Sequence, residues 1–164
     1  MSQTSQSFRT IMYRPHWSQW VISQGFMFLL CIGMLMAAGW EGMTIRLPFY
    51  IGAAFTGLCV LYGSLYLSKL RFIVTDEQLI IEHGVLSRSS DYIELYRVVD
   101  FGERRDIMEQ LFGLKTVSIY SGDRTTPRLD IYGIRENTDV VGIIRERVNY
   151  NKTIRHIYEF TNTK

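Results

Sequence analysis

The sequence predicts a membrane hairpin of two transmembrane helices, followed by a small, mainly-β barrel or sandwich that a C-terminal helix caps. The first observation is the charge distribution: residues 1–68 carry one acidic and three basic side chains, whereas residues 69–164 carry 15 of each sign. The second is that residues 15–40 and 47–68 contain no Asp, Glu, Lys or Arg. The third is that apolar residues alternate in short runs after Lys69, as they do in half-buried strands.

Both uncharged runs are long enough to cross a bilayer. The stretch from Trp20 to Trp40 has 21 residues, or about 31 Å of helix against a hydrocarbon core of about 30 Å. The second run has 22 residues. A chain of 164 residues is too small to cover two helices that are apolar on all sides, which favours transmembrane helices over buried core helices. The apolar core of the first run is longer than that of a signal peptide, so we expect an uncleaved span.

The ends of the two runs carry residues that favour the membrane–water interface. Aromatic rings prefer that zone, and Lys and Arg accumulate on its cytoplasmic side. The expected anchoring residues are Trp17, Trp20, Trp40, Lys69 and Arg71. Together with Arg9 and Arg14, the basic residues predict a multi-pass protein of the cytoplasmic (inner) membrane with both termini in the cytoplasm. Residues 41–46 are then a tight link between the spans.

The two spans contain small residues and no charged ones. Ala53 and Gly57 stand four residues apart, the small-xxx-small spacing of packed membrane helices. Packing within the hairpin is favoured over a dimer seam. Neither span holds an Asp, Glu, Lys or Arg, whereas a proton or ion pathway needs ionisable groups, so transport by this chain alone is not expected.

The soluble half is expected to contain six or seven short strands and two helices. A short helix follows Asp106 as its cap and ends at Gly113, and a final helix begins after Asn137 or Thr138. The expected strands cover residues 72–75, 79–82, a run beginning at 85–88, 92–96, 98–101, 116–120 and 128–132. On the final helix, one apolar stripe is formed by Val140, Val141, Ile144 and Val148.

The expected domain boundaries follow from these assignments. They are a cytoplasmic N-terminal segment (1–19), the transmembrane hairpin (20–68), the β domain with its helix (69–150) and a tail (151–164). The tail contains Ile154, Ile157, Tyr158 and Phe160, which fit no clear period. It either extends the final helix or docks on a partner.

Three segments carry a resemblance to a known family. Residues 79–88, 93–98 and 111–117 resemble the membrane-anchored bacterial pleckstrin-homology-like (PH-like) domain family, most specifically in GVLSR (84–88) and LFGL (111–114). The likeness extends over roughly residues 12–148. It implies a two-span hairpin with a PH-like domain, a type of domain that binds lipid headgroups, peptides or other proteins. A fold analogy of this kind does not by itself assign a function.

Signals for catalysis are absent from the sequence. His16, His83 and His156 are far apart, and no Cys or His pair has metal-ligand spacing. No nucleophile-elbow, Walker or dinucleotide-binding motif occurs. We therefore expect no enzyme, no metal and no cofactor. Nucleic-acid binding is also excluded, because the soluble half has no excess positive charge.

Two sets of residues are candidates for binding. Guanidinium and ammonium groups suit phosphate recognition, and the candidate anion- or lipid-binding residues are Arg88, Arg104, Arg105, Lys115, Arg124 and Arg128. Carboxylates are interleaved with them, so a salt-bridged surface is favoured over a headgroup site. Exposed tyrosines are common in interfaces, and the candidate interaction face is Tyr92, Tyr96, Tyr120 and Tyr132. Ordinary cross-strand tyrosine pairing explains the same pattern equally well.

The favoured function is a non-catalytic membrane protein that presents its PH-like domain for protein–protein interaction or assembly. Its expected partners are the lipid bilayer and either further copies of the chain or another membrane protein. Two alternatives remain open. One is a ligand-gated membrane effector whose β domain senses a small anionic ligand. The other is binding of anionic lipid headgroups.

Overall fold

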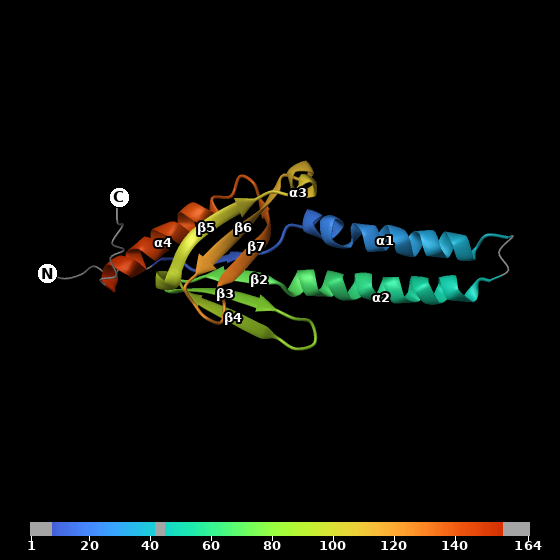
Figure 1. Ribbon diagram of the computed structural model, residues 1–164, viewed down its shortest axis with the longest axis horizontal. Helices are drawn as coiled ribbons and strands as arrows, with labels where there is room; N and C mark the ends of the chain where they lie inside the picture. Colours follow the sequence, from blue (N-terminus) through green and yellow to red (C-terminus); the bar gives the residue numbers. More distant parts are fainter. Residues whose placement is uncertain (1–7, 42–44, 156–164) are drawn as a thin grey trace.

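The computed structural model describes residues 8–41 and 45–155. Two long helices extend side by side from one end of a domain built of two sheets and a C-terminal helix (Figure 1). The predicted fold class is confirmed. The elements are β1 (Ile11–Tyr13), α1 (Ser18–Ala38), α2 (Leu47–Lys69), β2 (Arg71–Val74), β3 (Gln78–His83), β4 (Ser89–Glu94), a 3-10 turn (Leu95–Arg97), β5 (Val98–Arg104), α3 (Ile107–Leu111), β6 (Leu114–Ser121), β7 (Arg128–Arg135) and α4 (Val140–Ile154).

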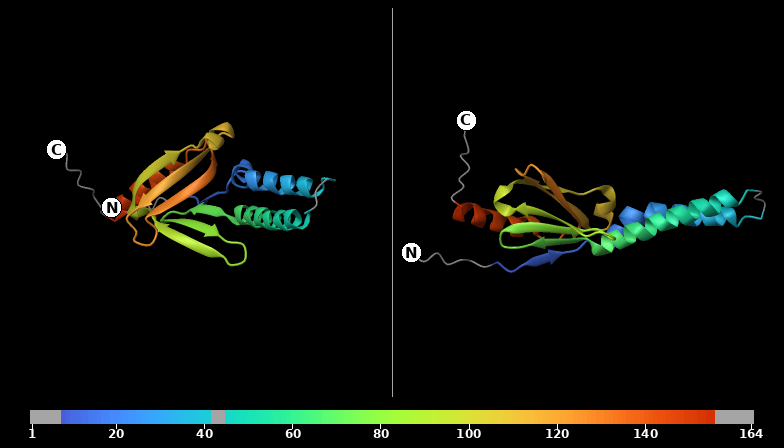
Figure 2. Two further views of the ribbon diagram at one scale, coloured as in Figure 1. Left: turned by 45° about the vertical axis from the view of Figure 1, so that its right-hand side comes forward. Right: turned by 90° about the horizontal axis from the view of Figure 1, so that it is seen from below.

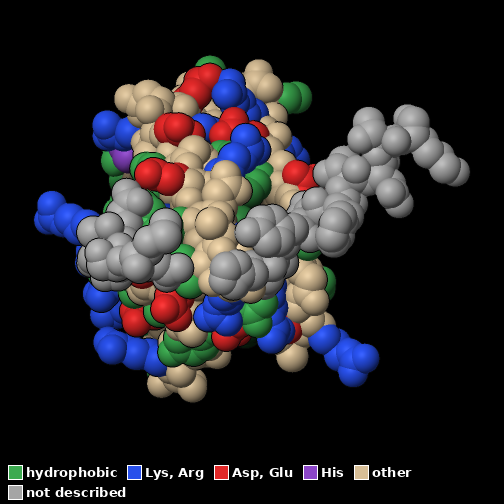
Figure 3. Space-filling view, turned by 90° about the vertical axis from the view of Figure 1, so that its left-hand side faces the viewer, with side chains coloured by type: hydrophobic (Ala, Val, Ile, Leu, Met, Phe, Trp, Pro, Cys, Tyr) green, Lys and Arg blue, Asp and Glu red, His purple; other side chains and the backbone are tan. Residues whose placement is uncertain are grey.

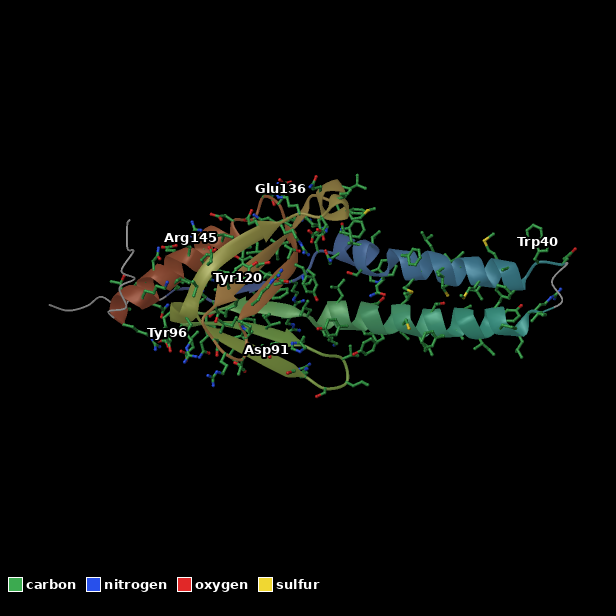
Figure 4. The ribbon with its side chains drawn as sticks, in the orientation of Figure 1. Trp40, Asp91, Tyr96, Tyr120, Glu136 and Arg145 are labelled. Atoms are coloured by element: carbon green, nitrogen blue, oxygen red, sulfur yellow. The ribbon has the colours of Figure 1, made fainter. Side chains whose placement is uncertain are left out.

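Helices α1 and α2 have 21 and 23 residues, and both are long and apolar enough to cross a membrane. Most of their surface is not covered by the rest of the protein, and large side chains such as Phe26 and Phe55 are exposed. The far tip of the pair carries Trp40 (Figure 4). Part of the predicted link, residues 42–44, lies outside the described residues.

The two helices pack through larger residues of α1 against small residues of α2. The side chain of Met34 covers Gly52, and that of Gln24 covers Gly63. Cys31 Sγ donates a hydrogen bond to the carbonyl of Ala53 at 3.3 Å. Ala53 is buried in this contact. The small residues thus serve packing within the hairpin, as favoured from the sequence.

Strand β1 precedes the hairpin in sequence but belongs to the same sheet as the strand that follows it. It pairs antiparallel with β2 in the register Ile11↔Val74, Met12↔Ile73 and Tyr13↔Phe72. The sequence patterns had placed residues 1–19 outside the β domain. The hairpin is instead inserted into the connection between two neighbouring strands, so both of its ends leave the domain at the same edge.

The start of α1 is fixed on strand β7. The backbone N–H of His16 donates to the carbonyl of Gly133 at 2.8 Å. Gly133 has a φ of +71°, and a Cβ at this position would lie 3.0 Å from Cβ of Pro15 and 3.1 Å from Cβ of Gln19. Glycine is therefore needed both for the backbone conformation and for the close approach of α1.

The strands form two antiparallel sheets, in the orders β1-β2-β3-β4 and β5-β6-β7. Between them lies one apolar core, which includes Phe72, Leu79, Ile93, Ile119 and Ile131. The strand expected to begin at residues 85–88 was wrong, because these residues form the turn between β3 and β4. Gly84, at φ +109°, reverses the chain there. The short helix after Asp106 is confirmed: the Asp106 backbone N–H donates to Glu109, and Gly113 ends it at φ +62°.

Helix α4 covers the core with the predicted stripe, in which Val140, Ile144 and Val148 are buried and Val141 partly so. Its N-cap is Asp139, whose carboxylate accepts from the N–H of Gly142. The predicted caps, Asn137 and Thr138, were wrong by one or two positions, because they precede the residue whose side chain closes the first turn. The helix continues to Ile154, while the apolar tail residues beyond 155 lie outside the described residues.

One buried arginine ties α4 to the beginning of the domain. Arg147 is 3% exposed. Its guanidinium donates to the carbonyls of Val74 (2.7 Å), Thr75 (2.9 Å) and Arg9 (2.6 Å). Arg147 thereby connects the C-terminal helix both to the end of β2 and to the segment that leads into β1.

Replacing Gly133 with Ala is expected to lower the free energy of unfolding by about 2–3 kcal/mol, from backbone strain together with the contacts against Pro15 and Gln19. Gly113→Ala is the matched control, because Gly113 also has a positive φ but nothing lies within 4 Å of its added Cβ. It is expected to lose only the backbone part, about 1 kcal/mol. Denaturant unfolding of the detergent-solubilised protein measures both, and equal losses would contradict the docking of α1 on Gly133.

Arg147→Met keeps an unbranched side chain but removes the donor that three backbone carbonyls share. We expect a loss of about 2–4 kcal/mol of unfolding free energy. Arg145→Met is the control on the same helix, since Arg145 is exposed and stacks on Phe101 at 5.5 Å, a contact worth about 0.5–1 kcal/mol. The same unfolding measurement compares the two variants. Similar losses of unfolding free energy would contradict the role of Arg147 in connecting α4 to β2 and to the segment before β1.

Candidate functional site

Four features of the molecule meet at the end of the domain that faces the helices. The start of α1, the end of α2, helix α3 and the β3–β4 turn lie at about the same level along the long axis (Figure 1). The two rotated views preserve this arrangement (Figure 2). We call this the proximal end, and the opposite end, where α4 ends, the distal end.

Three basic residues come together at the proximal end. Lys69 ends α2, Arg71 begins β2 and Arg88 follows the β3–β4 turn, and all three line one small pocket of about 30 Å³. Glu82, opposite Arg71 in the β2–β3 register, lines it too. The sequence had assigned Lys69 and Arg71 to anchoring and Arg88 to anion binding. The structure combines them in one basic cluster.

The next three candidates, Arg104, Arg105 and Lys115, lie beside α3 and are paired with carboxylates. Lys115 is buried, and its Nζ lies 2.9 Å from Glu103. The partners of the two arginines are Asp106, at 3.5 Å from Arg104, and Glu136, bonded to Arg105. These contacts are those of a salt-bridged surface.

The last two candidates, Arg124 and Arg128, lie on and after the β6–β7 connection. Arg128 donates to both carboxylate oxygens of Asp130, at 2.9 and 3.0 Å, and to Ser118 at 3.1 Å. Burial raises the pKa of Asp130, but the hydrogen bonds from Arg128 and Ser118 outweigh it and hold this pKa below its usual value. Arg124 is exposed in the loop.

The six candidate anion-binding residues therefore do not converge on one site. They divide among the β3–β4 turn, the surroundings of α3 and the β6–β7 loop. On the distal end, basic and acidic side chains are interspersed (Figure 3). Because opposite charges lie so close together, the positive electrostatic potential that could attract an anion is small.

The four candidate tyrosines also occupy different surroundings. Tyr92 is exposed on β4, Tyr120 is partly exposed on β6 under the guanidinium of Arg128, and Tyr96 lies in the 3-10 turn under that of Arg155. Tyr96 and Tyr120 are labelled in Figure 4. Tyr132 does not share a solvated face with them.

Tyr132 packs edge to face against the core residue Phe72, with ring centroids 5.8 Å apart. Burial raises the pKa of Tyr132 to about 12. The expectation that Tyr132 lies on the polar side of its strand assumed strict alternation. The bulge that contains Gly133 breaks this alternation, because Ile131 and Ile134 are both buried with two residues between them.

The aromatic residues expected to anchor the first span lie at both ends of α1. Trp17 precedes the helix and is exposed, and Trp40 follows it and is exposed as well. Trp20 Nε1 donates to Ser64 Oγ at 2.6 Å, which joins α1 to α2 near the domain. Trp20 thus has a packing contact in addition to its expected anchoring role.

His16 lies where α1 meets β7. Arg135 Nη2 is 2.9 Å from His16 Nε2, and a guanidinium only donates, so Nε2 is the acceptor. Burial, and then the charge of Arg135, lowers the pKa of His16 below its usual value. The ring is therefore neutral at neutral pH, in the state that this hydrogen bond requires.

Helix α3 and Leu86 expose large apolar side chains that the sequence patterns did not predict to be exposed. The apolar residues of α3 were assigned to a helix, and their exposure was not foreseen. The side chains of Ile107, Leu111 and Leu86 are 83%, 76% and 97% exposed. One feature of the sequence could have predicted this exposure: apolar side chains occur on several sides of a helix of only five residues, and such a helix cannot bury all of its sides.

The two sheets of four and three strands, closed by α4, define the domain as a PH-like sandwich. The family model described as bacterial PH domain matches residues 25–148, more than half of the chain. The chain therefore belongs to the bacterial PH domain family. Comparison with curated proteins finds no match, and comparison with solved structures finds none either. The family match begins inside α1, so β1 lies outside it.

The family indicates a domain for interaction rather than for catalysis. Within residues 8–41 and 45–155, no group of three or more His, Cys, Asp and Glu side chains is placed to hold a metal ion. The features available for binding are the basic cluster, the exposed apolar residues of the proximal end and the exposed aromatic residues elsewhere on the domain.

Proposed function

We propose that the chain is a two-pass protein of the cytoplasmic membrane that presents its PH-like domain in the cytoplasm for protein–protein contacts and assembly, without catalysis. The observation that carries this proposal is the insertion of an exposed, apolar helical hairpin between the paired strands β1 and β2. A hairpin held in this way extends from one edge of a folded domain. Its apolar surface needs a lipid environment.

The charges at the two ends of the hairpin support the orientation. Arg9 and Arg14 precede α1, and Lys69 and Arg71 lie at the end of α2, all of them on the domain side. The tip, in contrast, has one acidic and one basic residue, Glu41 and Arg46. The positive-inside bias therefore favours a cytoplasmic domain.

The surface around β5 supports a contact with protein. The register steps from Val98↔Ser121 to Asp100↔Tyr120, so Val99 is an extra residue in the strand. Its side chain is 65% exposed, and the neighbouring Tyr120 is 39% exposed. Aromatic residues such as Tyr are enriched in interfaces. Confinement to two dimensions raises the effective concentration, so weak contacts suffice for assembly.

Binding of anionic lipid headgroups is the second candidate, and one observation favours it: Lys69, Arg71 and Arg88 meet at the level where a bilayer surface would lie. Basic residues at such a position are attracted to anionic lipids. This basic cluster does not support the ligand-gated effector, which requires the basic residues to line a closed pocket. The pocket between these residues is about 30 Å³, whereas small-molecule sites have about 300–1,000 Å³.

The orientation is tested by labelling single cysteines with a membrane-impermeant maleimide in a Cys31→Ser/Cys59→Ser background. Glu41→Cys at the tip is expected to react in intact cells with a permeable outer envelope. Glu146→Cys, on the exposed side of α4, is expected to react only after the cytoplasmic membrane is opened. Labelling of both positions in intact cells, or of neither, would refute the orientation.

Assembly is tested with a photoreactive amino acid at Val99, irradiated in intact cells. We expect an adduct of defined mass, either of two copies of the chain or of the chain with one other membrane protein. The same amino acid at Glu146 is the control and is expected to give no such adduct. No adduct from Val99, or equal adducts from both positions, would reject this surface as the contact.

A further inference from the structure

Helix α3 is oriented with its apolar side chains away from the domain. Ile107, Met108 and Leu111 are 83%, 54% and 76% exposed, and Phe112, directly after the helix, is also exposed. The buried side chain of α3 is instead the carboxylate of Glu109, which is 4% exposed. This is the reverse of the pattern of an ordinary surface helix.

Hydrogen bonds hold α3 in this orientation. Glu109 Oε1 accepts from Thr116 Oγ1 on β6 at 2.5 Å, and Oε2 accepts from the backbone N–H of Asp106 at 3.0 Å. The buried carboxylate thus fixes the helix by its polar side. The apolar side is left as a raised patch next to the start of α1, where Trp17 is also exposed.

A second apolar point lies on the other side of the helix pair. Leu86 is the most exposed of the large apolar residues in the described part of the chain, at 97%. It stands on the β3–β4 turn, whose base adjoins the basic cluster of Lys69, Arg71 and Arg88. In Figure 1, α3 and this turn lie on opposite sides of the helices, at the level where α1 begins and α2 ends.

We infer that α3 and Leu86 enter the boundary between headgroups and acyl chains of the bilayer that the hairpin crosses, and that these two contacts fix the orientation of the domain on the membrane. The inference rests on the proposed transmembrane hairpin. A bilayer surface at this level meets both points, because both stand beside the ends of the same two helices. The apolar patch of α3 also adjoins the start of α1, where Trp17 is exposed.

The charges around the two points fit a lipid surface that contains anionic headgroups. Arg104 and Arg105 directly precede α3, although Asp106 and Glu136 pair with them. On the other side, Lys69, Arg71 and Arg88 lie around the foot of the β3–β4 turn, where the turn leaves the sheet. Apolar residues flanked by basic ones are typical of segments that lie in the membrane interface, about 5–10 Å deep.

The test uses the full chain, reconstituted in vesicles of phosphatidylcholine and phosphatidylglycerol, with an environment-sensitive fluorophore on a single cysteine in the Cys31→Ser/Cys59→Ser background. The probe positions are Ile107 and Leu86, and the matched control is Val99, an exposed apolar residue away from the helices. Nitroxide lipids labelled near the headgroup are expected to quench the first two probes several-fold more strongly than the third. Equal quenching at all three positions would overturn the inference.

A probe at Phe55, exposed in the middle of α2, separates the two proposals. Quenching at Phe55 by nitroxides deep in the acyl chains, without quenching at Ile107 and Leu86, leaves the span intact and overturns only the interfacial contacts. No quenching at Phe55 overturns the span itself. If the probes at Ile107 and Leu86 are shielded in native membranes but remain accessible to water in the vesicles, a protein covers these residues, and the inference is wrong.

The variant Ile107→Glu/Leu111→Glu supplies a second measurement. Both side chains already point to the outside, so the domain is expected to fold, and the circular dichroism spectrum checks this. Placing charges at the interface is expected to abolish quenching of a probe at Met108. Gln110→Glu, on the same exposed helix, is the control and is expected to leave the quenching nearly unchanged.

Discussion

The backbone pairing of β1 with β2 is the constraint on which the rest of the structure depends. The two strands pair through three residues each, and the chain between them contains both long helices. Neighbouring strands lie about 5 Å apart, whereas packed helices need about 8–10 Å between their axes. Only Leu70 separates α2 from β2. The difference between the strand spacing and the helix spacing is therefore bridged by residues 14–17, which precede α1. The contact of His16 with Gly133 fixes their path.

Polar groups inside the domain make this insertion rigid. Arg147 holds the segment before β1 and the end of β2 with one guanidinium, and α4 in turn covers the core between the sheets. Glu109 holds α3 beside the start of α1 in a similar way. The hairpin and the domain are therefore connected at several places, which fixes the orientation of the proximal end relative to the hairpin.

The basic residues proposed for anion binding differ in whether carboxylates pair with them. Most of the basic residues that the sequence offered for anion binding are paired with carboxylates, as in Arg128 with Asp130 and Lys115 with Glu103. Such pairs contribute little to recognition of a free anion. Lys69, Arg71 and Arg88, in contrast, come from three different segments and line one pocket at the proximal end together with a single carboxylate, that of Glu82.

The sequence by itself determined the two long apolar helices, most of the strands and the final helix, because each of these follows from the hydropathy pattern within one continuous segment. The tertiary structure decided the role of β1, whose three residues give no periodic signal and whose partner lies on the far side of the hairpin. It also decided the outward orientation of α3, the position of Tyr132 at the bulge that contains Gly133, and the meeting of Arg88 with Lys69 and Arg71. These features depend on contacts between residues far apart in the chain, and the pattern of any one segment does not record which distant segment it will face.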